Sequence, residues 1–419
     1  MLKALPLFLL ISAATSGAAT IKLDVKDLPS LIESRNGRIA SSLADIEASQ
    51  SDLGHLRRSF LPRLQLNLGY ENTDGTPQDD ISNSYGYATA MASINLYNGG
   101  RDELQEKSRS SQLDRSRSEL QNTKFNALTE ARTLYWQMLY QKEVISILET
   151  ALKLNETNLQ SALKKIRNNL ATKTDEIDFN QTKIQLGQDL KKARIILSNN
   201  MRAMAALLNH PLDTNYEVPE LNVHEPEHAL DHFENEEFTG EKHREIKTLE
   251  ALKSTFEFES SLNSRWWTPQ LDLYGAKTTR FQTLDKTNEM DRDQGEVLGV
   301  KLTFFFDGFQ AKSNSVTQSY RTMSLDHLKK QKVLELQSQY ANSYELYVLN
   351  HDLVHSAEEN NKIAQRYYEN VWNEYTRGVK NSPDVLQAFT RIVEAKLRYA
   401  DIKKDYQIAR AQIKGYLEQ

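Results

Sequence analysis

One short run in the sequence has the residue types and spacing of a catalytic zinc site. Residues 224–228 read His-Glu-Pro-Glu-His, the order in which zinc hydrolases place two histidines on the metal and a glutamate beside the bound water. The candidate residues are His224, Glu225 and His228, and His232 continues the spacing. Pro226 interrupts the helix that this geometry needs. We therefore keep a zinc hydrolase as a remote alternative, leave incidental metal binding open, and predict no enzyme and no cofactor.

The composition of the 419-residue chain excludes several other classes of protein. It has no cysteine, which rules out disulfides, thiolate metal sites and a cysteine nucleophile. Its 52 Lys and Arg against 57 Asp and Glu give a net charge of −5, without the basic field that binding nucleic acid requires. With only 9 Pro and 16 Gly and a mean hydropathy of −0.63, the sequence favours long, polar, uninterrupted helices.

The first 19 residues have the features of a removed export signal. Lys3 precedes an apolar core from Leu5 to Ile11, and Gly-Ala-Ala at residues 17–19 supplies small residues for cleavage. No later run of about 18 apolar residues could form a transmembrane helix. We expect the mature chain to be exported and to be soluble, peripheral or membrane-crossing as strands.

The two halves of the chain match at a nearly constant shift, which indicates a tandem duplication. Pro-Arg-Leu-Gln-Leu at residues 62–66 recurs as Pro-Gln-Leu-Asp-Leu at residues 269–273, and Lys-Thr-Asp at residues 173–175 aligns with Ser-Pro-Asp at residues 382–384. We predict a first repeat, an acidic connection and a second repeat, over residues 20–208, 209–245 and 246–419.

Each repeat contains alternating segments that predict one β-hairpin, at about residues 63–97 and 270–306. In the first hairpin Leu64, Leu66, Leu68 and Tyr70 alternate with polar residues. Aromatic residues collect at the strand ends, as they do at a membrane interface and in ordinary sheet cores. A sheet in lipid must close on itself and needs at least about eight strands, whereas one chain has four. Hairpins that cross a membrane would have to be pooled by several chains.

The remaining residues, 99–208 and 308–419, predict long coiled-coil helices. Apolar residues follow an uninterrupted 3-4 spacing from Val385 to Tyr416, and a similar spacing that includes Asn155 continues to Ile166. Residues 101–166 contain neither Pro nor Gly and would reach about 100 Å as one helix. This length suits a rod or the wall of a tube.

Together these features resemble the outer membrane efflux protein family, the TolC-like channels of bacterial pumps and secretion systems. The resemblance rests on three motifs: Phe-Leu-Pro-Arg-Leu-Gln-Leu at residues 60–66, Leu-Tyr-Asn-Gly-Gly-Arg at residues 96–101, and Tyr-Thr-Arg-Gly at residues 375–378 followed by Asp-Val-Leu at residues 384–386. It implies a mainly α fold with a small β part, in which the coiled-coil helices form a periplasmic α-barrel and the hairpins contribute to a trimeric 12-stranded transmembrane β-barrel.

The resemblance also implies a function and partners. The protein would be the outer membrane exit duct of a tripartite efflux or type I secretion system, conducting substrates passively from the periplasm to the exterior. Its partners would be two further copies of itself, outer membrane lipid, a periplasmic adaptor protein and an inner-membrane transporter. The connection at residues 209–245 would form a belt around the tunnel. A periplasmic adaptor or structural coiled-coil rod is the alternative, and it leaves the two hairpins unexplained. The substrate stays open.

A gate at the periplasmic tip is a further implication of the resemblance. The family's tip links fall on Tyr375 with Asp175 and on Lys380 with Thr174. A pore-facing aspartate falls on Asp384, and Gln387 replaces a second acidic residue. The turns that would dock the adaptor contain Asn169, Leu170, Gly378 and Val379, with Asn169 at a position where glycine is usual.

Helix capping is the competing interpretation of the two aspartates. An acidic side chain near the start of a helix is favoured by the helix dipole whether or not it faces a pore. For Asp384 this interpretation makes Ser382 the N-cap and Pro383 the first helical residue. The two interpretations can hold together.

Overall fold

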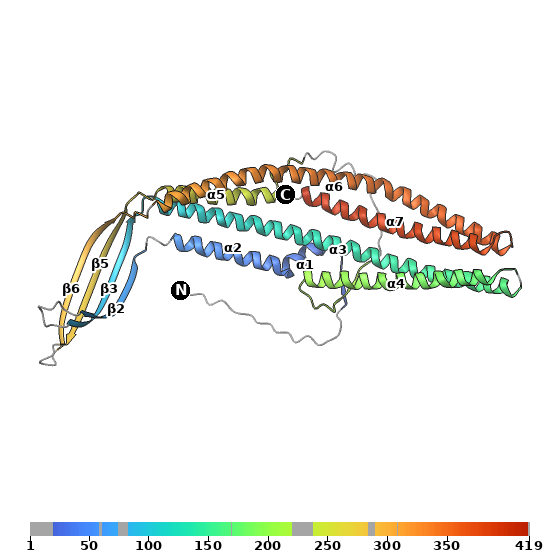
Figure 1. Ribbon diagram of the computed structural model, residues 1–419, viewed down its shortest axis with the longest axis horizontal. Helices are drawn as coiled ribbons and strands as arrows, with labels where there is room; N and C mark the ends of the chain where they lie inside the picture. The colour runs from blue at the N-terminus through green and yellow to red at the C-terminus, as the bar shows by residue number, and fades with distance from the viewer. Residues whose placement is uncertain are drawn as a thin grey trace. The chain divides into compact units, whose positions relative to one another are not determined.

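The computed structural model describes residues 20–57, 61–73, 83–168, 170–219, 238–283, 290–307 and 309–417 (Figure 1). Its helices are α1 (Leu28–Arg35), α2 (Gly37–Leu56), α3 (Arg101–Arg167), α4 (Lys173–Leu207), α5 (Arg244–Ser264), α6 (Gln310–Thr376) and α7 (Ser382–Leu417). Its strands are β1 (Thr20–Lys22), β2 (Arg63–Thr73), β3 (Asn83–Tyr97), β4 (Asn215–Glu217), β5 (Gln270–Thr283) and β6 (Met290–Thr303). The predicted export signal, Asn169, and the motif of His224, Glu225 and His228 with His232 lie outside the described residues.

The described chain is mostly helical with a small sheet part, as predicted. Two helices are 67 residues long, α3 and α6, and neither contains a proline or glycine that would break it. Asp102 and Glu103 lie in the first turn of α3 and Lys164, Lys165 and Arg167 in its last turn, which suits the helix dipole at both ends. No described helix is both long enough and apolar enough to cross a membrane.

The chain divides into two compact units. One unit contains the described parts of residues 1–40, 123–238 and 337–419, and the other contains those of residues 41–122 and 239–336. We call them the helical unit and the sheet unit, and α3 and α6 contribute residues to both.

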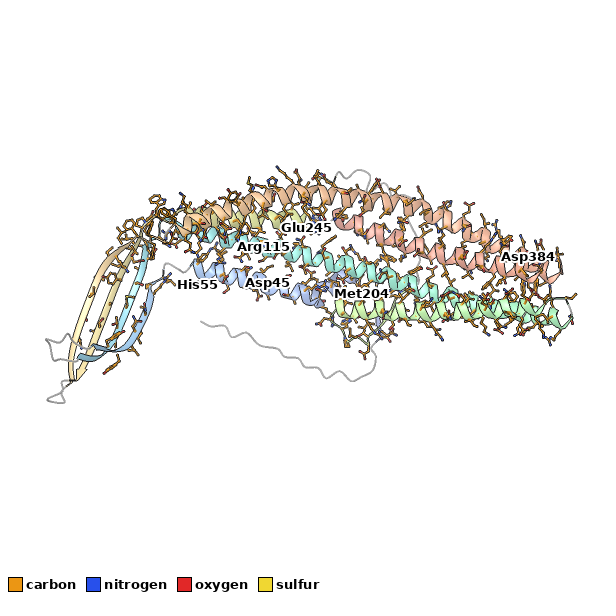
Figure 2. The ribbon with its side chains drawn as sticks, viewed as in Figure 1. Asp45, His55, Arg115, Met204, Glu245 and Asp384 are labelled. Atoms are coloured by element: carbon orange, nitrogen blue, oxygen red, sulfur yellow. The ribbon has the colours of Figure 1, made fainter. Side chains whose placement is uncertain are left out.

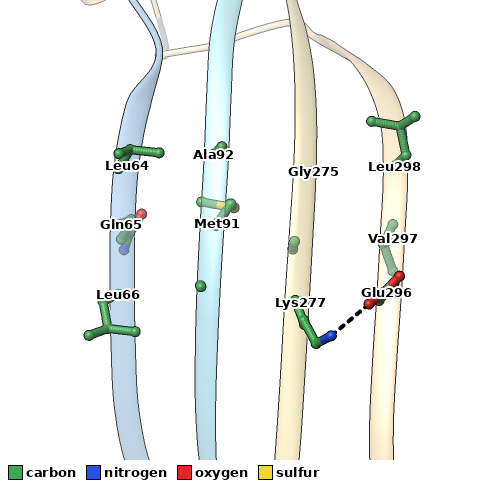
Figure 3. A pocket seen from close by; sticks show the side chains of 12 residues that line it. Leu64, Gln65, Leu66, Met91, Ala92, Gly275, Lys277, Glu296, Val297 and Leu298 are labelled. Carbon is green, nitrogen blue, oxygen red and sulfur yellow. Dashed lines mark hydrogen bonds and ion pairs between the residues drawn. The ribbon is translucent and has the colours of Figure 1, made fainter.

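The sheet unit contains a four-stranded antiparallel sheet in the order β2-β3-β5-β6. The two hairpins predicted from the sequence are joined edge to edge, because β3 pairs with β5 over most of its length. One row of the register runs Leu64, Ala92, Gly275 and Leu298 across the four strands, and these residues therefore share one face (Figure 3).

Two arginines fix the turns between this sheet and its helices. The Arg101 guanidinium donates to the carbonyl oxygens of Arg265 and Thr268, at 3.1 and 2.8 Å. In return, Arg265 donates to the carbonyl oxygen of Gly99 at 3.1 Å. Gly99 has a φ of +64°, and a Cβ there would stand 2.0 Å from the Thr268 hydroxyl. The Gly-Gly-Arg of residues 99–101 is therefore a strand-to-helix turn that holds the helix-to-strand turn between α5 and β5 in place.

The helical unit packs α3, α4, α6 and α7 around a continuous core (Figure 1). Small and large apolar side chains alternate in it, for example Ala162 of α3, Phe179 of α4 and Ala388 and Phe389 of α7. We call α3 with α4 the first helical hairpin and α6 with α7 the second. Tyr347 and Tyr406 stack at 5.3 Å and are fully buried between the helices of the second hairpin.

Candidate functional site

The predicted tip residues lie where each helical hairpin turns. In the first turn, Asp175 stands in the first turn of α4 and is 9% exposed. Its Oδ2 accepts hydrogen bonds from the amide and hydroxyl groups of Thr172, at 2.7 and 3.1 Å. Thr172 is therefore the N-cap of α4 and Asp175 completes a capping box with it, in line with the capping interpretation. Thr174 beside it is exposed.

The two turns share one backbone hydrogen-bond pattern. The amide of Val379 donates to the carbonyl oxygen of Glu374 at 2.9 Å, and that of Leu170 donates to the carbonyl oxygen of Lys165 at 2.8 Å. Both are bonds across five residues that close a helix C-terminus. Gly378 supplies the positive φ, +84°, in the second turn. Leu170 and Val379 are 73% and 72% exposed, so each turn presents one apolar side chain to its surroundings.

Asp384 lies near the start of α7 (Figure 2). Its Oδ2 accepts from the Asn381 amide at 3.2 Å, and its own amide donates to Asn381 Oδ1 at 3.1 Å. The cap is therefore Asn381, and the expectation that Ser382 caps this helix is wrong by one residue, because the Asn381 side chain reaches the free amide of Asp384. Asp384 is half-buried and Gln387, three residues on, is exposed.

Tyr375 is the most buried of the predicted tip residues, at 1% exposure. Its hydroxyl lies 3.4 Å from the Ser382 hydroxyl, and no hydrogen bond joins it to Asp175 among the described residues. Burial raises the pKa of Tyr375, and the Asp175 carboxylate adds to this effect. Lys380 and Thr174 are both exposed, and the described part of the chain shows no hydrogen bond between them.

Two contacts between the helical hairpins were not anticipated from the sequence. The Tyr368 hydroxyl donates to Asn158 Oδ1 at 2.9 Å, with both side chains buried. One heptad further on, the Lys165 ammonium lies 3.4 Å from the centre of the Tyr375 ring and donates to the Tyr375 carbonyl oxygen. The sequence does show polar residues one heptad apart along α3. The spacing of residues within one helix, however, does not identify the residues that they contact in another helix.

A groove of about 460 Å³ lies on the surface of the same unit, along α4 and α7. Its polar edge comes from α4, including Asp178 and Gln181, and its apolar edge from α7, including Phe389 and Val393. Beneath the groove the two helices contact each other and share the apolar core.

The sheet presents two different faces. On one face, Leu64 and Leu298 are each 83% exposed, and Leu66, Leu68 and Val300 are 63–73% exposed. The opposite face is polar: Asn95 donates to Asp272 at 2.7 Å, and the hydroxyls of Thr89 and Thr278 lie 3.1 Å apart. The alternation predicted in the sequence is thus an alternation between an apolar and a polar face. An ion pair of Lys277 and Glu296, at 2.8 Å, ends the leucine rows of β5 and β6 on the apolar face (Figure 3).

Comparison with known proteins identifies a family and a fold. The sequence matches the model of the family described as outer membrane efflux protein over residues 28–209 and 243–418. A direct search of curated relatives finds no match. Across the described residues, no group of three or more His, Asp or Glu side chains is arranged to hold a metal ion.

Solved structures of outer membrane channels share the fold. The outer membrane protein VceC of Vibrio cholerae superposes with a TM-score of 0.77 at 13% identity, over 94% of this chain and 95% of that chain. The CmeC channel of Campylobacter jejuni gives 0.80 at 13% identity, over 94% and 85%. The open state of the MtrE channel of Neisseria gonorrhoeae gives 0.76 at 15% identity, over 94% and 88%. At these identities the likeness shows the fold.

Proposed function

The chain belongs to the outer membrane efflux protein family, and from this premise we propose that it is the exit duct of a tripartite efflux or type I secretion system. Substrates pass through it passively from the periplasm to the exterior, and a gate at the two helical turns controls the passage. The energy for transport comes from a partner in the inner membrane.

Membership of the family establishes the general class of protein, an outer membrane efflux channel. Its members are trimeric outer membrane channels with a large periplasmic helical portion, which work with adaptor proteins and inner-membrane pumps. The predictions of an outer membrane location and of a protein that is not an enzyme are confirmed. The remote alternative of a zinc hydrolase is therefore abandoned.

The two-faced sheet is the observation that supports a duct most directly. Exposed leucines on one face and hydrogen-bonded polar side chains on the other are what a sheet needs to separate lipid from a water-filled interior. Each chain contributes four described strands to this sheet, and both its edge strands, β2 and β6, have a free side. Three chains in a trimer would close twelve strands and leave no edge in lipid.

The turns of the two helical hairpins support a gate. Each turn presents one exposed apolar residue, Leu170 or Val379, which suits docking of an adaptor. Tyr375 lies buried between the turns. The predicted link of Tyr375 with Asp175 stays part of the proposal because the Asp175 carboxylate lies near enough to raise the pKa of Tyr375. The predicted link of Lys380 with Thr174 also stays, because both side chains are exposed and neighbouring subunits of a trimer can pair them.

Single-channel recording in planar lipid bilayers tests the proposal. A gate that is closed at rest predicts a small, flickering conductance for the detergent-extracted wild type. A Tyr375→Phe, Lys380→Ser double variant removes two of the proposed tip links, and its conductance should rise several-fold. A protein that stays soluble without detergent and never conducts would return the periplasmic adaptor or coiled-coil rod to first place.

A further inference from the structure

A polar seam joins the two helical hairpins near their turns. It consists of two contacts between α3 and α6: Asn158 with Tyr368, and Lys165 with Tyr375. Both partners advance by seven residues from the first contact to the second. Because residues one heptad apart lie on the same side of a coiled-coil helix, the two contacts form one continuous stripe.

The two helical hairpins also meet between α4 and α7, whose buried side chains share one apolar core. That attachment is apolar, whereas the seam between α3 and α6 adds hydrogen bonds and a charge. Of the two seam contacts, Lys165 with Tyr375 is the one nearer the turns, because both residues lie in the last turns of their helices.

Lys165 acts on the C-terminal ends of two helices at once. It lies in the last turn of α3, and its ammonium donates to the carbonyl oxygen of Tyr375 in the last turn of α6. The last turn of α6 has no basic residue of its own. A cation at this position is favoured by the partial negative charge of both helix ends. Lys165 thus places a positive charge from the first hairpin beside the last turn of α6, which has no basic residue within it.

The ring of Tyr375 adds a second attraction. The ammonium stands 3.4 Å from the ring centre, and the ring is almost completely buried. Lys165 is half-buried, and burial lowers its pKa. An attraction between a cation and an aromatic ring strengthens as water is removed from around it.

We propose that Lys165 is a further residue of the gate, a positioning residue that holds Tyr375 and the end of α6 against α3 in the closed state. The second hairpin can move away from the first at the tip only after this contact breaks. The inference rests on the proposed function, because a gate has meaning only in a channel.

Three single variants test this role in bilayer recordings. Lys165→Met keeps the length of the side chain and removes the charge, and it should raise the ratio of open to closed time by about fivefold. Lys165→Arg retains a cation that stacks on aromatic rings and should stay near the wild type. Lys164→Met is the matched control: it removes the same charge from the same helical turn, but its side chain is exposed.

Hydrogen exchange of the peptide that covers residues 374–384 provides a readout that does not depend on conductance. Exchange should be faster in the Lys165→Met trimer and unchanged in the Lys164→Met trimer. If wild-type protein conducts but the Lys165→Met and Lys164→Met variants agree in both measurements, the role of Lys165 is overturned and the channel stands. If neither the wild type nor the Tyr375→Phe, Lys380→Ser variant conducts, both proposals fall.

Discussion

Single side chains at helix starts carry much of the local chemistry of this protein. Asp175 and Asp384 each accept a hydrogen bond from the residue three positions earlier, at the start of α4 and of α7. Both therefore have a structural reason to be acidic that is independent of any pore. His243 likewise caps the start of α5, because its Nδ1 accepts a hydrogen bond from the Glu245 amide at 3.4 Å.

His243 should make the stability of the sheet unit dependent on pH. It is 2% exposed, and burial, assisted by the positive charge of Arg244, lowers its pKa from 6.5 to about 4. The unfolded state then binds a proton more readily than the folded state between these two values. The contribution of His243 to the free energy of unfolding is therefore fully present above pH 6.5, and this free energy falls by up to about 3 kcal/mol as the pH approaches 4.

A His243→Asn variant isolates this effect, because asparagine also caps helices but does not titrate. Its thermal unfolding should depend less on pH between 6.5 and 4 than that of the wild type. Exposed His327, changed to Asn, serves as the control and should leave the wild-type pH dependence in place. If the unfolding temperatures of all three proteins changed equally with pH, protonation of His243 would not destabilise the folded state.

At the scale of elements, the turns decide how strands continue into helices. Gly99 and Gly100 adopt positive φ angles, and the space where their Cβ atoms would lie is occupied by the side chains of Thr268 and Arg265. The turn between β3 and α3 and the turn between α5 and β5 are thereby locked together. This lock also explains why the first repeat has two glycines before Arg101.

A Gly99→Ala substitution should destabilise the protein by about 2 kcal/mol, because it strains a left-handed backbone and displaces Thr268. Gly187 lies inside α4, where an added Cβ would have nothing within 4 Å, and Gly187→Ala should stabilise the protein by about 0.5–1 kcal/mol. Denaturant unfolding of the two variants and the wild type measures both changes. The idea of the lock fails if Gly99→Ala unfolds at the wild-type denaturant concentration.

At the scale of the whole molecule, the exposed leucine face of the sheet is unfavourable in water and requires an apolar environment. One chain leaves Leu64, Leu66, Leu298 and Val300 more than half exposed in a sheet with two open edges. In the proposed trimer, lipid would cover the apolar face and other subunits would pair with the two edges. The proposal therefore requires membrane insertion and oligomerisation together.

Neighbouring residues of β6 provide a matched test of this arrangement. Leu298 belongs to the apolar face and Val297 to the polar face. A Leu298→Arg substitution should weaken insertion by about 2–4 kcal/mol if that face meets lipid, whereas Val297→Arg should be tolerated. The yield of folded trimer in outer membranes, measured by its mobility shift on heating, compares them. Equal yields would contradict the assignment of the two faces.

The sequence alone determined the long helices and the faces of the strands, and it predicts a tandem repeat. Alternation in residues 64–70 and 298–302 defines a face because side chains in a strand point to opposite sides in turn, and the long runs without Pro or Gly define α3 and α6 because nothing breaks them. These are local properties of the chain. Family resemblance, likewise read from the sequence, predicted a helical turn at Gly378, which adopts the positive φ that such a turn needs.

Only the tertiary structure decided which elements meet. The pairing of β3 with β5, the contact of Lys165 with Tyr375 and the hydrogen bond of Asn158 with Tyr368 join residues between 174 and 210 positions apart. Periodicity tells which side of a helix is buried, but many other helices could cover that side equally well. The partners are chosen by the combined packing of four helices and four strands, which no single segment encodes.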